Sequence, residues 1–211
     1  MSAVTSSAAS DRQWFIVGRW QEYEGEGRAN LLRIVAIGSF YTLQLANFYL
    51  FTVQSPDELP FHQKATALSV AWVLLSLAIL MCLRRQILPA VLKFVSTGCD
   101  VVLLTALAIA GNGANSPLVF AYFLIIALAA LRFSLRLVWF ATLGCMAGYL
   151  ATVGAKDSTW FDAHHIVPPV EQLVMLLSLG LTGIIVGQVI RRVRGLAEDY
   201  ARRMAAQRGA T

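Results

Sequence analysis

A succession of long apolar segments is the feature that most constrains how this chain can fold. Six such segments alternate with short polar stretches, at residues 31–53, 65–83, 94–110, 117–131, 137–153 and 170–190. A helix that crosses a bilayer needs about 20 mostly apolar residues. The sequence therefore predicts an all-α polytopic membrane protein, built as a bundle of six transmembrane helices.

The composition agrees with this fold class. Hydrophobic residues make up 57% of the chain and charged residues only 14%, whereas soluble domains average about 25% charged residues. The net charge of +5 comes from basic residues at the ends of the apolar segments. That placement orients membrane spans and does not indicate nucleic-acid binding. The cysteines lie in apolar segments without metal-ligand spacing, so we expect free thiols.

The basic residues also predict an orientation. Of the 17 lysines and arginines, only Lys64 and Lys156 fall in loops on one side of the predicted bundle. The others fall on the opposite side: Arg12, Arg19, Arg28, Arg33, Arg84, Arg85, Lys93, Arg132, Arg136, Arg191, Arg192, Arg194, Arg202, Arg203 and Arg208. Loops rich in Lys and Arg stay in the cytoplasm, so both termini are predicted to be cytoplasmic.

Three regions follow from this topology: a cytoplasmic N-terminal segment at 1–30, the transmembrane domain at 31–190, and a cytoplasmic C-terminal helix and tail at 191–211. In residues 11–24, aromatic and apolar side chains recur at three-residue steps, at Trp14, Val17 and Trp20. This spacing predicts a short amphipathic helix at the membrane interface. The alternative is a loop with scattered aromatic residues.

The sixth apolar segment continues without a break into the charged C-terminal region. Four residues at spacings of three, four and four define a possible partner-helix seam: Val193, Leu196, Tyr200 and Met204. Such a heptad-like pattern suits packing against another helix. The alternative is an ordinary charged helix that leaves the membrane.

Small residues in the last two segments predict close helix contacts. The fifth segment contains Gly144-x-x-x-Gly148, and the sixth contains Gly180, Gly183 and Gly187. Such residues let helix backbones approach each other inside a membrane.

Asp100 is the acidic residue that the sequence places deepest in an apolar segment. It follows Lys93 by seven residues, or about 10 Å at 1.5 Å per residue. An ionised Asp near a bilayer centre costs about 3 kcal/mol. Five side chains are candidate partners: Arg33, Arg132, Arg136, Ser96 and Thr97. The sequence leaves open whether Asp100 is a structural ion-pair member or a proton- or ligand-responsive group.

Two amides share one face of the first segment. Gln44 and Asn47 lie three residues apart near its middle, and amides in hydrocarbon need polar partners. This face is predicted to point into the bundle, where it could line a path together with Asp100.

Histidines and a carboxylate in the predicted outer loops are weak candidates for a metal site: His62, His164, His165 and Asp162. An ordinary solvated loop is the alternative. The chain contains none of the phosphate-loop, zinc-protease, redox or nucleophile-elbow motifs. We therefore expect no catalytic activity.

The run from Asp100 through the turn Gly111-Asn112-Gly113-Ala114-Asn115-Ser116-Pro117 to Ala129-Ala130-Leu131-Arg132-Phe133 resembles the six-helix membrane sensor modules of bacterial histidine kinases. Similar modules precede diguanylate cyclases. The resemblance covers residues 28–203 and rests on general layout. It implies a sensor or anchor in the bacterial inner membrane. We expect no kinase or cyclase domain after Arg208, and therefore a homodimer or a protein partner in trans.

The sequence therefore favours a sensor-like or regulatory membrane module that acts through protein contacts. A small transporter or channel is the first alternative, and an assembly subunit of a larger membrane complex is the second. Membrane lipid is an expected partner in each case.

Overall fold

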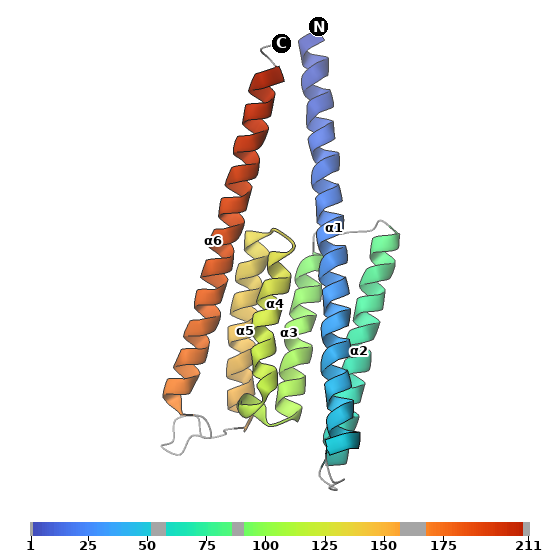
Figure 1. Ribbon diagram of the computed structural model, residues 1–211, viewed down its shortest axis with the longest axis vertical. Coiled ribbons are helices and arrows are strands. Elements are labelled where there is room, and N and C mark those ends of the chain that lie inside the picture. Colours follow the sequence, from blue (N-terminus) through green and yellow to red (C-terminus); the bar gives the residue numbers. More distant parts are fainter. Residues whose placement is uncertain (1, 52–57, 86–90, 157–167, 209–211) are drawn as a thin grey trace.

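The computed structural model of the chain is a bundle of helices (Figure 1). It describes residues 2–51, 58–85, 91–156 and 168–208, with the backbone alone at 2–22, at 51, 58 and 156, and at several positions near the C-terminal end. The α helices in these ranges are α1 (Ser2–Ala46), α2 (Glu58–Arg84), α3 (Leu92–Ala110), α4 (Ala121–Ala130), α5 (Leu135–Lys156) and α6 (Pro169–Arg208). These ranges contain no strand, so the prediction of an all-α fold is confirmed.

Five of the helical segments are long and apolar enough to cross a membrane: Tyr23–Leu50, Leu59–Arg84, Leu92–Ala110, Leu135–Ala155 and Pro169–Ala197. The remaining apolar segment, Pro117–Ala130, is shorter. It begins with a 3₁₀ turn at Pro117–Phe120 and continues as α4. The structure thus supports a membrane protein, while a sixth complete span stays a prediction.

The turn between α3 and α4 forms as its composition predicts. Ser116 caps the Pro117–Phe120 turn, because its hydroxyl accepts a hydrogen bond of 3.3 Å from the backbone N–H of Leu118. Pro117 occupies the first helical position, where a missing N–H costs nothing. Gly113 has a φ of 65°, which glycine adopts without steric strain.

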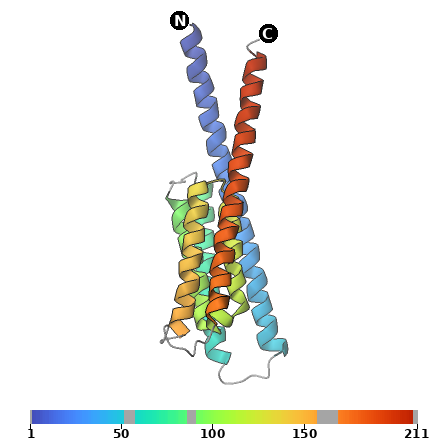
Figure 2. The same cartoon turned by 90° about the vertical axis from the view of Figure 1, so that its left-hand side faces the viewer.

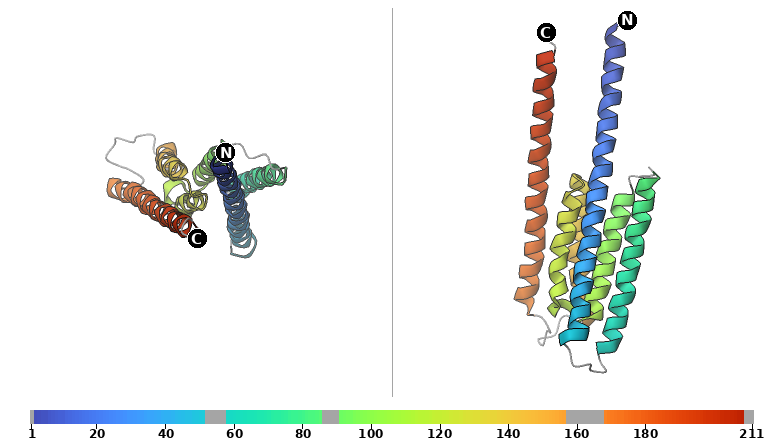
Figure 3. Two further views of the ribbon diagram at one scale, coloured as in Figure 1. Left: turned by 90° about the horizontal axis from the view of Figure 1, so that it is seen from above. Right: turned by 45° about the vertical axis from the view of Figure 1, so that its right-hand side comes forward.

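The core of the bundle lies around α3, α4 and α5. In the most apolar stretch of α5, 50% of the residues are buried. In the most apolar stretch of α2, only 11% are buried. Tyr122 on α4 is fully buried, and its hydroxyl lies 2.8 Å from Thr105 Oγ1 on α3 and 3.3 Å from Thr152 Oγ1 on α5. Seen from above, α4 and α5 lie between α6 and the group formed by α1, α2 and α3 (Figure 3).

Both termini lie at the same end of the bundle, and α1 and α6 project well beyond the other helices there (Figures 1 and 2). The continuity predicted between the sixth apolar segment and the C-terminal region is present in α6. The N-terminal prediction differs from the structure, because residues 11–24 are part of α1 and not a separate short helix. Residues 24–30 contain no proline, which would end or kink a helix. The helix therefore continues through these residues, and α1 extends out of the bundle as one unbroken helix. The side chains of Trp14, Val17 and Trp20 lie outside the described residues.

Two glycines mark close contacts between helices. A Cβ on Gly148 of α5 would lie 2.6 Å from Thr105 Oγ1, and a Cβ on Gly183 of α6 would overlap the side chain of Thr142 on α5. By contrast, a Cβ on Gly180 would meet nothing within 4 Å. The small-residue contacts predicted for the last two segments therefore exist, but only some of the glycines make them.

Gly183→Ala should destabilise the bundle, whereas Gly180→Ala in the same helix should not. Overpacking a well-packed contact costs about 1–3 kcal/mol, and only Gly183 faces such a contact. Thermal unfolding of the purified variants in mild detergent measures the difference. Equal unfolding temperatures for the two variants would show that α5 and α6 do not pack as described.

Candidate functional site

Asp100 on α3 and Arg33 on α1 form a buried ion pair. Arg33 Nη2 and Nε donate to Asp100 Oδ2 at 2.6 and 3.1 Å. The side chains are 3% and 5% exposed. Trp72 Nε1 on α2 donates to the other carboxylate oxygen, Oδ1, at 2.7 Å. Both oxygens of Asp100 are therefore engaged, and three helices meet at one carboxylate.

The third nitrogen of Arg33 extends this network to α2. Arg33 Nη1 donates to Asn30 Oδ1 at 3.0 Å, and Asn30 Nδ2 donates to the backbone carbonyl of Ser76 at 3.1 Å. A buried charge is tolerated when its hydrogen-bonding capacity is satisfied. These bonds satisfy Arg33 through side chains of its own helix and of α3.

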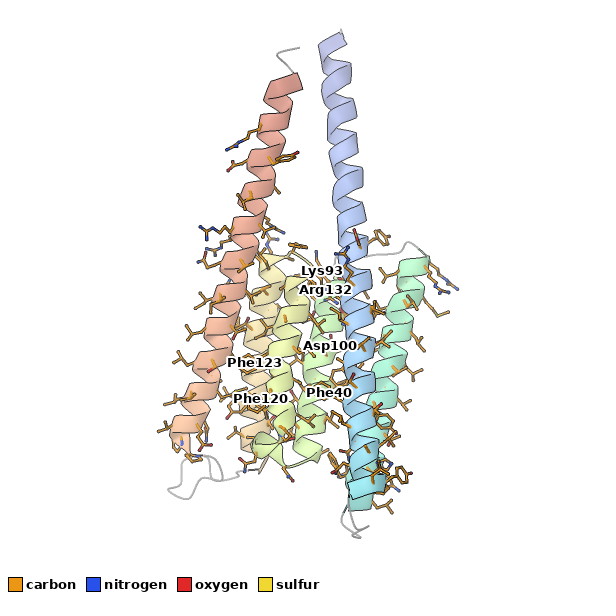
Figure 4. The ribbon with its side chains drawn as sticks, in the orientation of Figure 1. Phe40, Lys93, Asp100, Phe120, Phe123 and Arg132 are labelled. Carbon is orange, nitrogen blue, oxygen red and sulfur yellow. The ribbon has the colours of Figure 1, made fainter. Side chains whose placement is uncertain are left out.

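A second buried arginine lies nearer the end of the bundle from which α1 and α6 project (Figure 4). Arg132, in the turn between α4 and α5, donates from Nη1 to the carbonyl of Lys93 at 2.8 Å and to Thr97 Oγ1 at 2.7 Å. Its Nη2 donates to Ser96 Oγ at 3.0 Å. Arg132 thereby joins the α4–α5 turn to the first turns of α3.

Arg132 also forms an ion pair with Glu26 on α1. Glu26 Oε2 lies 3.1 Å from Arg132 Nη2, in an orientation that makes no hydrogen bond, and each side chain is 4% exposed. Burial lowers the pKa of the Arg132 guanidinium, and the carboxylate of Glu26 opposes that effect. Arginine nonetheless stays protonated in proteins. The two ion pairs bring together two positive and two negative charges, and the positive charge of Lys93 also acts on the carboxylate of Glu26.

The α4–α5 turn contacts both projecting helices. On one side, a Cβ on Gly25 of α1 would lie 3.1 Å from the carbonyl oxygen of Leu131, so the two backbones are close. On the other side, Arg194 of α6 donates to the carbonyl of Phe133. Phe133 has a φ of 48°, a conformation that is uncommon for a residue other than glycine. The turn is thus fixed between α1 and α6.

A cavity of about 790 Å³ lies beside the Arg33–Asp100 pair. Its walls come from α1, α2, α3, the α3–α4 turn and α4. Gln44 and Asn47 line it together with Arg33 and Asp100, so the polar residues that the sequence singled out share one cavity. Trp72 also lines it and was not anticipated.

Other predicted site residues lie elsewhere. Arg136 is exposed on α5 and forms no ion pair within the described residues. Thr97 does not bond to Asp100; its hydroxyl donates to the carbonyl of Lys93 at 2.8 Å and accepts from Arg132. Hydroxyls in helices often bond in this way to the carbonyl four residues earlier.

The candidate metal residues are not brought together in the described parts of the chain, where no group of three or more metal-ligating side chains occurs. The ring of His62 stacks on Phe48 with centroids 4.2 Å apart. His164, His165 and Asp162 lie outside the described residues. In the proposed partner seam, Val193, Leu196 and Tyr200 are exposed, and the side chain of Met204 is not described.

The spacing of residues in the sequence could have pointed to Glu26 and Asn30, which the sequence analysis did not single out. Glu26, Asn30 and Arg33 are spaced by four and three residues, which places them on one face of a helix. Trp72 gave no such sign, because it lies in an apolar segment where any face of the helix could point inward.

Comparison of the chain with protein-family models, with curated proteins and with solved structures gives no match. Its function is therefore argued from its own residues.

Removing one member of the Arg33–Asp100 pair should destabilise the protein strongly. Arg33→Leu or Asp100→Leu alone leaves a buried charge unpaired, and this costs about 3–5 kcal/mol. The double variant Arg33→Leu/Asp100→Leu should lose clearly less stability than the sum of the losses in the two single variants. Thermal unfolding in detergent provides the measurement, with the exposed Arg136→Leu as the control. Additive losses would show that the two side chains do not act as a pair.

Proposed function

We propose that this chain is a membrane-embedded, sensor-like or regulatory module that acts through contacts with a partner protein or a second copy of itself. The observation that carries the proposal is the projection of α1 and α6 from the same end of the bundle, with the α4–α5 turn fixed between them. A movement within the bundle that shifts this turn would shift both helices. Continuous helices can transmit such shifts over a distance.

The exposed seam on α6 supports a contact function. Arg194 bonds to the α4–α5 turn at the end of the bundle, so the residues that follow it lie beyond α2, α3, α4 and α5, at the end where α1 also projects (Figure 1). There Leu196 and Tyr200 are each 67% exposed. Apolar side chains that recur at heptad spacing outside the membrane are suited to pack against another helix.

The proposed setting is the bacterial inner membrane, with six spans and both termini in the cytoplasm. The support is the distribution of basic residues together with the common end at which α1 and α6 leave the bundle. The layout shared with bacterial sensor modules is a further reason. The proposal includes no catalytic activity for this chain.

A small transporter or channel is the second candidate, because Asp100, Gln44 and Asn47 line one cavity. It ranks second because the buried Arg33–Asp100 pair bounds the cavity, and Asp100 lies on the side of the cavity toward Arg132 (Figure 4). A path through the protein would have to pass this pair. An assembly subunit of a larger complex would share the contact surfaces proposed for α6.

Disulfide cross-linking should detect the seam in native membranes. In a background without native cysteines, Leu196→Cys should form cross-linked dimers, whereas Ala197→Cys should not, because adjacent helical positions point about 100° apart. Leu196→Glu and Tyr200→Glu should weaken association in mild detergent. A protein that is strictly monomeric, unaffected by either change and without a partner would favour the transporter candidate.

Cysteine labelling tests the proposed orientation. A membrane-impermeant thiol reagent applied to intact cells should label Pro60→Cys and not Arg85→Cys, because these exposed positions lie at opposite ends of α2. Both should react after the membrane is permeabilised. Labelling of Arg85→Cys in intact cells would reverse the orientation.

A further inference from the structure

The cavity opens toward the lipid-facing surface between α1 and α4. Three of its lining residues are substantially exposed: Phe40 and Leu43 on α1 are 43% and 66% exposed, and Leu124 on α4 is 38% exposed. At Gly25, α1 closely approaches Leu131, which directly follows α4. Farther along α1, the cavity occupies the space between the two helices. A molecule dissolved in the bilayer could therefore enter it without crossing the protein.

The cavity has the size and shape to hold an elongated small molecule. Its volume of about 790 Å³ lies within the range of about 300–1,000 Å³ for small-molecule sites. Its lining residues extend from Arg33 on α1 to Asn47, the first residue of the π-helical turn that follows α1, which corresponds to about 21 Å at 1.5 Å per residue. Most of the wall between these ends is aliphatic or aromatic, including Ile37, Leu104 and Leu128.

Among the polar side chains on the wall, Gln44 has hydrogen-bonding capacity that the described residues do not use. Gln44 lines the cavity and is only partly exposed, and its amide has no hydrogen bond to any described residue. An amide in hydrocarbon gains from a polar partner. Gln44 can both donate and accept, so a hydroxyl or carbonyl oxygen on a bound molecule would complete its hydrogen bonding.

The charges beside the cavity argue against a charged occupant. Arg33 and Asp100 neutralise each other, and the donors and acceptors between them are engaged by Asn30 and Trp72. An ionised ligand would bring an unpaired charge into a low-dielectric site, which is costly. A neutral ligand carries no such penalty.

We propose that the cavity is a binding site for a neutral, elongated amphiphile that enters from the bilayer between α1 and α4, with a hydroxyl or carbonyl oxygen hydrogen-bonded to Gln44. Its apolar chain lies along the aliphatic wall formed by α1, α3 and α4. The Arg33–Asp100 pair closes the site at one end.

Photolabelling in membranes tests this site. The probe is a long-chain primary alcohol with a diazirine in the middle of its chain, added to vesicles that contain the purified protein. Labelled peptides, identified by mass spectrometry, should come from the facing parts of α1 and α4. Ala121→Trp, which fills the cavity, should remove this labelling. Ala78→Trp, on an exposed position of α2, is the matched control and should leave it unchanged.

Competition identifies the chemistry of the occupant. An unlabelled alcohol should compete about fivefold better than the alkane of equal length, as expected for one hydrogen bond of about 1 kcal/mol. The corresponding ionised fatty acid should compete less well than the alcohol. Gln44→Leu should remove the preference for the alcohol over the alkane and still permit labelling, so this variant remains informative if Ala121→Trp fails to fold.

Labelling spread evenly over the lipid-facing helices would overturn the site, and so would equal labelling of the Ala121→Trp and Ala78→Trp variants. A preference for the alcohol that survives Gln44→Leu would overturn the role of Gln44. None of these results would change the contact function proposed for α6, because that function depends on different residues.

Discussion

The buried ion pair between Arg33 and Asp100 is the interaction on which the placement of α1 and α2 against the rest of the bundle depends. In hydrocarbon, each of these charges alone would be expensive. Together, with Asn30 and Trp72 as further hydrogen-bond partners, they fix α1 against α2 and α3 at a single depth. Apolar packing in a membrane lacks such direction, because lipid tails solvate apolar side chains equally well. The polar contacts therefore set the position of α1.

The position of α1 explains why this helix contacts the α4–α5 turn at one end of the bundle and is separated from α4 by the cavity farther along. Near the projecting helices, Glu26 and Arg132 add a second ion pair that ties α1 to the α4–α5 turn. Beyond Arg33, α1 and α4 are separated by the cavity. The α4–α5 turn also contacts α6, because Arg194 donates to the carbonyl of Phe133. Any change in the angle of α1 at the cavity would thus reach the turn and the second projecting helix, which links the proposed binding site to the proposed contact surface.

The helical fold could be predicted from the apolar segments and the charges at their ends, because a helix that crosses a bilayer needs a certain apolar length and carries its charged residues outside that length. The pairing of Asp100 with an arginine followed from the cost of burying a carboxylate. Which arginine it would be could not be predicted, since that depends on helix rotation, which uniformly apolar segments do not encode. Residues 11–24 were predicted as a separate surface helix because amphipathicity does not show whether a helix continues into the next segment. Trp72 was missed because apolar neighbours hid its orientation.

Solid-state NMR of the protein in lipid bilayers tests the central ion pair most directly. The measurement is the dipolar coupling between the side-chain nitrogens of ¹⁵N-labelled arginine and the carboxyl carbon of ¹³C-labelled Asp100, assigned by its loss in Asp100→Asn. With Arg33 Nη2 placed 2.6 Å from Asp100 Oδ2, the carboxyl carbon lies one bond farther away, and we expect a measurable coupling that disappears in Arg33→Leu, together with a carboxyl shift typical of an ionised group. A protonated Asp100 without coupling to any arginine would contradict the account.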